Sequence, residues 1–216
     1  MEKVDDASKQ PKAVQRAAQI KAVVLSDTHG QLSQLVENAI SAQSPDLIVH
    51  AGDIACAQIL WRLEMIAPTF AVKGNCDFDP EIIKLPAIAR KSIGNSVLVL
   101  THRPEDLYRD LDRDLDRSLY SSPDCCLEKT LGNPALKASS NDAIDRALGA
   151  KNKYIIGIHG HTHIPELTTK MLSGTPVQIV CPGSVTQPRG DSVPTIAAIT
   201  AQERGAVAPT IEFIEV

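Results

Sequence analysis

Short apolar segments alternate with amphipathic segments in the first part of the chain, and this alternation restricts the possible folds most strongly. Residues 20–25, 46–49 and 69–72 have the length of β-strands, whereas 32–40 and 55–66 repeat apolar side chains at helical spacing. Such an alternation predicts parallel strands joined by crossover helices. Each apolar segment ends in a polar cluster, and the functional loops of such sheets lie at the carboxyl ends of the strands.

Short strands dominate the chain after residue 80. Residues 89–93 and 96–101 flank Gly94-Asn95, a dipeptide that supplies the positive φ angles of a tight hairpin turn. A second turn is expected at Ser173-Gly174. Further strands are predicted at 154–158, 167–171, 177–180, 195–200 and 211–216. The first half is therefore predicted to be α/β and the second half mostly antiparallel β.

Residues 103–152 interrupt this pattern and predict a helical insertion. Leucines recur every four residues from Leu107 to Leu119 among aspartates and arginines, which is typical of an amphipathic helix. Pro104 suits the first position of this helix, and a second helix is predicted over 141–148. The insertion is a lid over the site, an interface in a homodimer or a tolerated surface insertion.

The composition limits the class of protein. The 216 residues suit one domain with additions or two very small ones, and we expect a disordered tail at 1–19 followed by one domain at 20–216. No apolar segment approaches the length of a membrane span. Aromatic residues are 3% and the net charge is −4, so no stable complex with nucleic acid is expected. The five cysteines include no Cys-x-x-Cys pair, which favours a reducing, cytoplasmic compartment.

The polar clusters contain side chains that bind metals. Two aspartates, one asparagine and four histidines each follow a predicted strand: Asp27, His29, Asp53, Asn75, His102, His161 and His163. Oxygen and imidazole ligands without thiolate suit Mn, Fe, Ni or Zn. Seven ligands are too many for one tetrahedral ion but suit two divalent ions that share a bridge. Such a centre attracts a phosphate group and stabilises charge on the attacking and leaving oxygens.

Each of these elements also has an ordinary explanation when it is taken alone. An Asp-x-His pair occurs often by chance, and Gly52-Asp53 and Gly74-Asn75 are turn dipeptides. A lone histidine such as His102 is commonly a surface or core residue. In an extended strand end, the two side chains of an Asp-x-His or His-x-His pair would point to the same side. Four such elements in this order, each at a predicted strand end, indicate a shared site.

The complete pattern resembles the calcineurin-like metallophosphoesterase superfamily, and most closely its small phosphodiesterase branch from bacteria and archaea. The resemblance runs from about residue 20 to 216, apart from 103–152. It is carried by Asp27-x-His29, Gly52-Asp53, Gly74-Asn75-Cys76-Asp77, His102, Gly160-His161-Thr162-His163 and Pro182-Gly183-Ser184. The resemblance implies a four-layer α/β/β/α sandwich of two mixed sheets, an α/β (α+β) fold with a dinuclear metal centre.

The resemblance also implies a division of the ligands between two divalent ions, with Mn expected and Ni, Fe or Zn as alternatives. One ion would be held by Asp27, His29, Asp53 and His163. The other would be held by Asp53, Asn75, His102 and His161, so that Asp53 bridges the two. A metal-bound hydroxide would then attack phosphorus in line. The residues expected to take part in catalysis are Asp53, Asn75, Cys76, His102 and Arg189.

Several positions depart from the family pattern. Many relatives have histidine in place of Cys76, whose thiol is uncharged at neutral pH and donates hydrogen bonds weakly. Cys76 therefore either favours substrates with good leaving groups or only fills the loop. Arg103 replaces a usual glycine and either clamps substrate phosphate or begins the insertion helix. Cys181 replaces a usual asparagine, and Arg189 matches a family arginine that contacts phosphate or forms a salt bridge.

Three functions remain to be compared. The first is a phosphodiesterase that acts on small or nucleotide-like phosphoesters, and a phosphomonoesterase is its near alternative. The second is a scaffold like the vacuolar-sorting subunit of retromer, which has this fold but lacks several ligand histidines. A protein phosphatase is disfavoured because Gly52-Asp53 does not continue into the Asp-x-x-Asp-Arg-Gly pattern. His50 is expected to orient a ligand, and His159 lies near the site or in the core.

Overall fold

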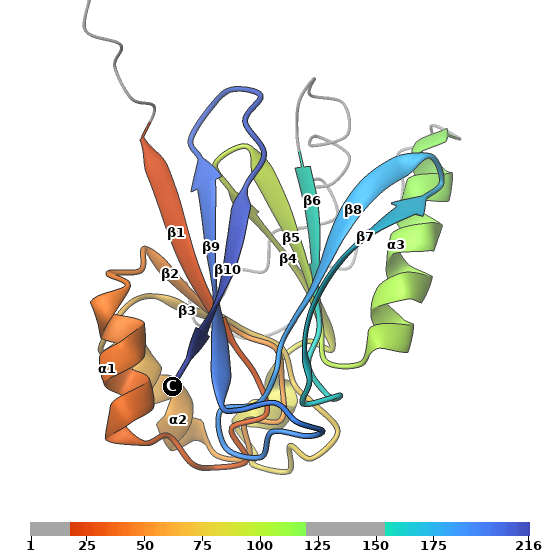
Figure 1. Cartoon of the computed structure of the whole chain (residues 1–216). Helices are drawn as coiled ribbons and strands as arrows, with labels where there is room; N and C mark the ends of the chain where they lie inside the picture. Colours follow the sequence, from red (N-terminus) through yellow and green to blue (C-terminus); the bar gives the residue numbers. More distant parts are fainter. Residues whose placement is uncertain (1–17, 120–153) are drawn as a thin grey trace, which may run out of the picture.

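Two five-stranded sheets face each other in the computed structural model, which describes residues 18–119 and 154–216 (Figure 1). The strands of the first sheet are β1 (Gln19–Leu25), β2 (Leu47–His50), β3 (Thr69–Ala71), β9 (Thr195–Gln202) and β10 (Thr210–Glu215). Their order is β10-β9-β1-β2-β3. β1, β2 and β3 are parallel, as the strand–helix alternation predicts, whereas β9 and β10 pair antiparallel.

The second sheet has the order β4-β5-β6-β8-β7. Its strands are β4 (Ile88–Ile93), β5 (Ser96–Thr101), β6 (Tyr154–Ile158), β7 (Pro165–Leu172) and β8 (Thr175–Pro182). The strands after residue 80 make four antiparallel pairings, β4–β5, β7–β8, β9–β1 and β9–β10, so the expectation of a mostly antiparallel second half is confirmed. The parallel pairing of β5, β6 and β8 at the centre of the second sheet was not predicted. The connection from β5 to β6 is long enough for a crossover, which parallel pairing requires.

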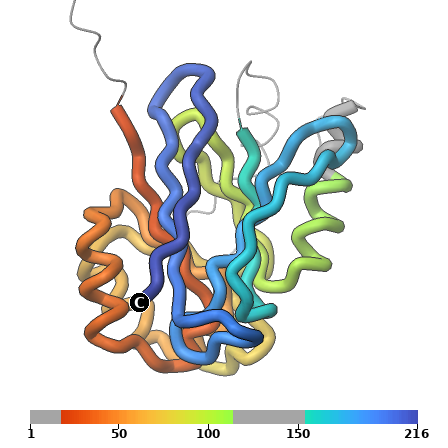
Figure 2. Tube along the Cα trace, viewed as in Figure 1, coloured from red at the N-terminus to blue at the C-terminus, as the bar shows by residue number. Residues whose placement is uncertain are grey.

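Three separate hydrophobic cores divide the molecule into four layers (Figures 1 and 2). The central core lies between the two sheets. A second core packs the helices α1 (Gln34–Ala42) and α2 (Ala57–Glu64) on the first sheet. A third core packs α3 (Pro104–Leu119) on the second sheet. The predicted α/β/β/α sandwich of two mixed sheets is therefore confirmed.

Alternation along each strand explains how one sheet serves two cores. Successive strand residues point to opposite faces of a sheet. In β1, Ala22 and Val24 belong to the central core, while Val23 and Leu25 face the helices. Strands that are buried on both faces need continuous apolar runs, which is the pattern that the first strands show in the sequence.

The helix α3 begins at Pro104 as predicted, and its apolar face contacts the second sheet. Leu107 and Leu111 are almost completely buried in the third core. Gly157 of β6 makes this close packing possible, since a Cβ atom there would lie 3.0 Å from Leu107 Cδ2 and 2.9 Å from Ile179 Cδ1. A buried ion pair between Arg90 of β4 and Asp110 adds a polar link between the helix and the sheet edge.

The predicted hairpin joins β4 and β5, with Ile93 opposite Ser96. Of the two turn residues only Gly94 has a positive φ, +52°, which is the pattern of a type II′ turn with glycine in its first position. The short 3-10 helix η1 (Ile82–Lys84) precedes this hairpin. The predicted helix 141–148 and most of the predicted tail lie outside the described residues. No helix in the described ranges is both long and apolar enough to cross a membrane.

Candidate metal centre

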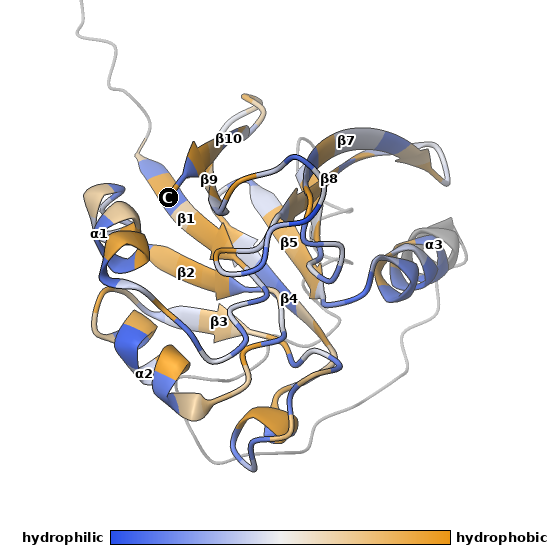
Figure 3. Ribbon diagram, turned by 60° about the horizontal axis from the view of Figure 1, so that its bottom comes forward, coloured by the Kyte–Doolittle hydropathy of each residue, from blue (hydrophilic) through white to orange (hydrophobic). Residues whose placement is uncertain are grey.

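The predicted site residues follow β1, β2, β3, β5 and β6, and these strands end at one side of the molecule. This side comes forward in Figure 3. The strands are mostly hydrophobic there, whereas the connecting loops in front of them contain hydrophilic residues. The loops after β1 and β2 run side by side, because Asp27 N donates to Gly52 O at 3.0 Å and His29 N donates to Asp53 O at 3.0 Å. These backbone bonds place the two predicted aspartate ligands beside each other.

An unusual backbone conformation is concentrated in these loops. Eight non-glycine residues in the described ranges have a positive φ, and five of them are predicted ligands: Asp27 (+54°), His29 (+45°), Asp53 (+55°), His161 (+70°) and His163 (+62°). The Asp-x-His and His-x-His pairs were expected in extended strand ends, and this expectation is wrong. Both residues of each pair have left-handed backbone conformations and lie in loops. Left-handed conformations of this kind cost free energy, and they gather at functional sites whose surroundings enforce them.

Glycines of the sequence motifs allow the loops to approach one another. Gly52 has φ +90°, and a Cβ atom on it would lie 2.8 Å from both Cβ and Nδ1 of His102. A Cβ atom on Gly74 would lie 2.0 Å from Asp53 Oδ1 and 2.3 Å from Asp53 N. The Gly-Asp and Gly-Asn dipeptides are therefore needed for close approach of the loops as well as for turn conformation.

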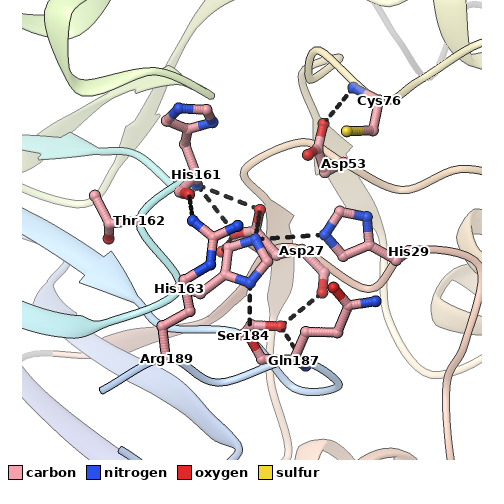
Figure 4. Close-up of polar contacts among 12 residues, drawn as sticks. Asp27, His29, Asp53, Cys76, His161, Thr162, His163, Ser184, Gln187 and Arg189 are labelled. Atoms are coloured by element: carbon pink, nitrogen blue, oxygen red, sulfur yellow. Dashed lines mark hydrogen bonds and ion pairs between the residues drawn. The ribbon is translucent and has the colours of Figure 1, made fainter.

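Asp27 is completely buried and lies where loops of the two sheets meet (Figure 4). Its Oδ1 lies 3.1 Å from His163 Nε2, and its carboxylate accepts a hydrogen bond from the backbone N–H of His161. The Ser26 hydroxyl donates a hydrogen bond to Asp27 Oδ2 at 2.6 Å. The carboxylate thus has a fixed orientation, and one oxygen faces an imidazole nitrogen.

Two histidines are held in the tautomer that metal ligands need. His163 donates from Nδ1 to the carbonyl of Gln187 at 2.6 Å, and His102 donates from Nδ1 to the carbonyl of Ala51 at 2.9 Å. Because Nδ1 carries the proton in each neutral ring, the lone pair of Nε2 faces the site. His102 Nε2 is buried without a hydrogen-bond partner and lies 3.3 Å from Asp53 Oδ1. Lone pairs that face carboxylate oxygens repel one another unless a cation or proton lies between them.

The spacing of these atoms fits a shared cation. His29 Nε2 lies 3.4 Å from His163 Nε2, and the two imidazole–carboxylate pairs are 3.1 and 3.3 Å apart. Two ligand atoms that are each about 2.1 Å from one ion lie about 3.0 to 3.4 Å apart in octahedral or tetrahedral geometry. The residues that the structure brings together therefore fit divalent metal ions in both the type and the spacing of their donor atoms.

Potential metal ligands form three groups of three residues, and within each group the ligand atoms lie within 4.8 Å of one another. They are Asp27 with His29 and His163, Asp27 with Asp53 and His102, and His29 with Asp53 and Cys76. Asp27, His29 and Asp53 each belong to two groups, so the three groups form one continuous cluster. Among the described residues, none of these groups includes His161, whose ring instead meets that of His102 edge-on at a centroid distance of 5.2 Å.

The electrostatic environment favours a charged Asp53 and a neutral His161. Burial tends to raise the pKa of Asp53, but the contact with His102 and the hydrogen bond from the Cys76 backbone N–H outweigh it and hold this pKa well below its usual range. Burial tends to lower the pKa of His102, yet contact with Asp53 leaves it raised. Burial lowers the pKa of His161, and the nearby His102 and Arg103 lower it further. A neutral imidazole and an ionised carboxylate are the forms that bind cations.

Asn75 and Cys76 lie at the exposed edge of the centre. The amide Nδ2 of Asn75 contacts Cys76 Sγ at 3.2 Å, and Cys76 N donates to Asp53 Oδ1 at 2.8 Å. Both side chains are exposed, unlike the aspartates. Burial and the nearby Asp53 raise the pKa of the Cys76 thiol, so it stays protonated at neutral pH.

The two arginines singled out in the sequence both lie near His161. Arg189 donates to the carbonyl of His161 at 3.4 Å and forms no ion pair with the described residues (Figure 4). The salt-bridge explanation of Arg189 therefore has no support within the described ranges. Arg103 is exposed at the start of α3 and lies close enough to lower the pKa of His161. Both guanidinium groups remain candidates for contact with an anion.

Several residues that hold the ligands were not predicted. Asp77 accepts hydrogen bonds from Ala55 N and Gly74 N, both at 2.6 Å, and so braces the loop before Cys76. Ser184 and Thr186 donate to the backbone carbonyl of Asp27 at 2.8 and 2.9 Å. Asp77 and Ser184 belong to the sequence motifs and Thr186 lies two residues beyond them, but their roles could not be predicted because the contacts join distant parts of the chain.

The remaining histidines contribute to the surroundings of the centre. His50 is completely buried and contacts Thr28 Oγ1 through Nε2 at 3.1 Å, so it supports the loop between two predicted ligands. Within the described ranges it makes no hydrogen bond to a ligand side chain. His159 is also buried, and its Nδ1 donates to Gly160 O at 3.0 Å. His159 is therefore both near the site and part of the interior.

The chain is similar to known proteins in sequence and in fold. The family model described as calcineurin-like phosphoesterase superfamily domain matches residues 20–204. A probable metallophosphoesterase of Methanothermobacter thermautotrophicus is 42% identical over 57 residues, which are 25% of this chain and 33% of that protein. The aligned region thus spans about a third of the relative's length.

Solved structures share the fold at low sequence identity. An archaeal protein described as a novel phosphodiesterase superposes with a TM-score of 0.56 at 17% identity, covering 90% of this chain and 100% of that one. Vacuolar protein sorting 29 from Cryptosporidium parvum superposes with a TM-score of 0.51 at 14% identity, covering 92% of this chain and 99% of its own. These likenesses establish the architecture alone.

Proposed function

Because this chain belongs to the calcineurin-like phosphoesterase superfamily, we propose that it is a metal-dependent phosphodiesterase acting on small or nucleotide-like phosphoesters. The observation that carries the proposal is the pair of buried imidazole nitrogens, Nε2 of His102 and of His163, that face carboxylate oxygens 3.3 and 3.1 Å away. Their arrangement is explained by divalent ions that Asp27 and Asp53 hold together with these rings.

The proposed ligands of the centre are the seven residues of the sequence motifs. Asp53 is the proposed bridge, because its Oδ1 faces His102 and its carboxylate also belongs to a group with His29. His161 and Asn75 are proposed to complete the second site. The ions, when bound, would supply Lewis acidity and lower the pKa of water, and Mn, Ni, Fe and Zn all suit this set of ligands.

The protein's own residues would bind and orient the substrate. Arg189 lies beside the His161 backbone and is exposed, in a position to donate to non-bridging phosphate oxygens. Arg103 offers a second cation near His161. Cys76 stays protonated at this edge, so it contributes no positive charge toward a leaving group. This favours esters whose leaving groups are stable without protonation.

The test is to strip the protein with chelator, restore single metals and assay bis(p-nitrophenyl) phosphate beside p-nitrophenyl phosphate and nucleotides. We expect metal-dependent hydrolysis with the diester preferred. Asp53→Asn should lower kcat/KM by at least about 100-fold, because the lost bridge removes several kcal/mol of transition-state stabilisation. Asp46→Asn is the matched control, since Asp46 precedes β2 at the opposite end and accepts a hydrogen bond from Lys21 N.

Other outcomes would change the assignment. Faster hydrolysis of p-nitrophenyl phosphate than of the diester would make the protein a phosphomonoesterase. Protein that binds no metal and hydrolyses nothing would favour a scaffold role, as the shared fold of the sorting protein allows.

A further inference from the structure

Cys76 connects two proposed ligands of the same metal ion. Its backbone N–H donates to Oδ1 of Asp53 at 2.8 Å, and its sulfur lies 3.2 Å from Nδ2 of Asn75. The sulfur also belongs to the group within 4.8 Å that includes Asp53 and His29. Cys76 therefore contacts Asp53 through its backbone N–H and Asn75 through its sulfur.

The contact with the sulfur determines how the Asn75 amide is oriented. Nδ2 of Asn75 donates to Cys76 Sγ at 3.2 Å, so the sulfur is the acceptor of this hydrogen bond. A lone pair accepts only from an N–H donor, so Nδ2 of the amide faces the sulfur and the carbonyl oxygen Oδ1 faces away. This Oδ1 accepts no hydrogen bond from any described residue.

An amide ligand needs such a constraint. Only Oδ1 carries a lone pair that can bind a cation, because Nδ2 is a donor without acceptor capacity. The Asn75 side chain is exposed, and no other side chain of the described residues holds it. Without the sulfur contact the amide would rotate freely, and ordering it would cost free energy each time an ion binds.

We propose that Cys76 is a positioning residue whose sulfur holds the Asn75 amide so that Oδ1 is presented to the ion shared with Asp53 and His102. This inference rests on the proposed metal centre. It assigns residue 76 a role toward the protein's own ligand, distinct from contact with the leaving group of a substrate.

Isothermal titration of metal-free protein with Mn²⁺ tests the inference by a binding measurement. Wild-type protein should bind two ions. Cys76→Ala should bind the first with unchanged affinity and the second about 10- to 100-fold more weakly, the usual effect of removing a group that orients a ligand. Cys76→Ser keeps a donor and an acceptor at the same place and should recover most of the lost affinity.

A double mutant separates positioning from a general effect on the loop. If Cys76 acts through Asn75, then adding Cys76→Ala to Asn75→Ala should not weaken Mn²⁺ binding beyond the loss that Asn75→Ala causes. Cys56→Ala is the matched control, because Cys56 lies at the start of α2 without a side-chain capping bond and should leave both affinities unchanged. Circular dichroism of each variant verifies that the protein is folded.

The outcomes distinguish the two proposals. Wild-type protein that binds fewer than two ions overturns the dinuclear centre and the positioning role with it. Wild-type protein that binds two ions, with Cys76→Ala binding both equally well, overturns only the positioning role. Additive losses in the double mutant overturn it as well, because they show that Cys76 acts independently of Asn75.

Discussion

Gly74 has no room for a side chain, and this gives a sharp test of the centre. A Cβ atom there would lie 2.0 Å from Asp53 Oδ1 and 2.3 Å from the Asp53 backbone nitrogen. Gly74→Ala must therefore displace the proposed bridge. We expect Mn²⁺ affinity to fall by at least about 10-fold, the loss that follows when a ligand is no longer held in place, as measured by isothermal titration.

Gly174→Ala serves as the control for that change. Gly174 has φ +80° in the turn between β7 and β8, and a Cβ atom on it would have no neighbour within 4 Å among the described residues. The substitution strains the backbone and should lower stability, yet it should leave Mn²⁺ affinity unchanged. Equal losses of affinity in the two variants would contradict the close approach of Gly74 to Asp53.

His50 makes stability depend on pH. Burial, with help from the nearby His102, lowers the pKa of His50 to about 3. In the unfolded chain His50 is protonated below about pH 6.5, whereas in the folded protein it stays neutral down to about pH 3. The contribution of neutral His50 to the free energy of unfolding is therefore fully present above pH 6.5 and is lost as the pH falls toward 3. Between about pH 7 and pH 5 this loss amounts to about 2 kcal/mol.

His50→Asn removes the titrating group and should remove that part of the pH dependence. The measurement is urea unfolding of metal-free wild-type and variant protein at about pH 7 and pH 5. The free energy of unfolding of the wild type should fall by about 2 kcal/mol more than that of the variant. Identical decreases would mean that His50 is protonated in the folded protein.

Among the elements, α3 is attached to the second sheet by a narrow apolar face. Leu111 is 1% exposed in the core shared with Leu107 and Ile179. Leu111→Ala should lower the free energy of unfolding by about 2 to 5 kcal/mol, because it removes buried methyl groups and leaves a cavity. Leu35→Ala of α1, where the side chain is 72% exposed, should cost less than about 0.5 kcal/mol.

Equal effects of the two leucine substitutions in urea unfolding would contradict the packing of α3. The position of this helix was foreseen because its leucine spacing is a local signal. The close packing of α3 against Gly157 of β6 was not predicted, because the two elements are distant in the sequence and meet only in the folded chain. The same holds for Asp110, whose partner Arg90 lies on another element.

For the whole molecule, metal binding should join the two sheets. The proposed ligands come from loops after β1 and β2 of the first sheet and after β5 and β6 of the second. An ion present at about 100 times its dissociation constant adds about 2.7 kcal/mol to the stability of the folded state. We expect Mn²⁺ to raise Tm by about 5 to 10 °C over the chelated protein in scanning calorimetry.

Asp53→Asn is the control for this thermal shift, because it should abolish most of it while retaining the fold. A variant that gains as much as the wild type would show that Mn²⁺ binds elsewhere on the protein. The experiment also separates an effect of the ion on stability from its effect on turnover.

Local patterns were sufficient to recognise the strands, the first helices and the chemical type of the site. Period-two and helical spacing depend only on neighbours along the chain, and the ligand residues follow strands whose ends must meet at one edge. The family resemblance rested on the same residues, and the match over 20–204 confirms it.

Contacts between distant segments decided the rest. β5, β6 and β8 pair in parallel, and β9 returns to the first sheet beside β1, because these pairings depend on which faces are buried together. The left-handed backbone at Asp27 and His163 is enforced by neighbouring loops. The contact of the Cys76 backbone N–H with Asp53 likewise joins two loops that only the folded chain brings together.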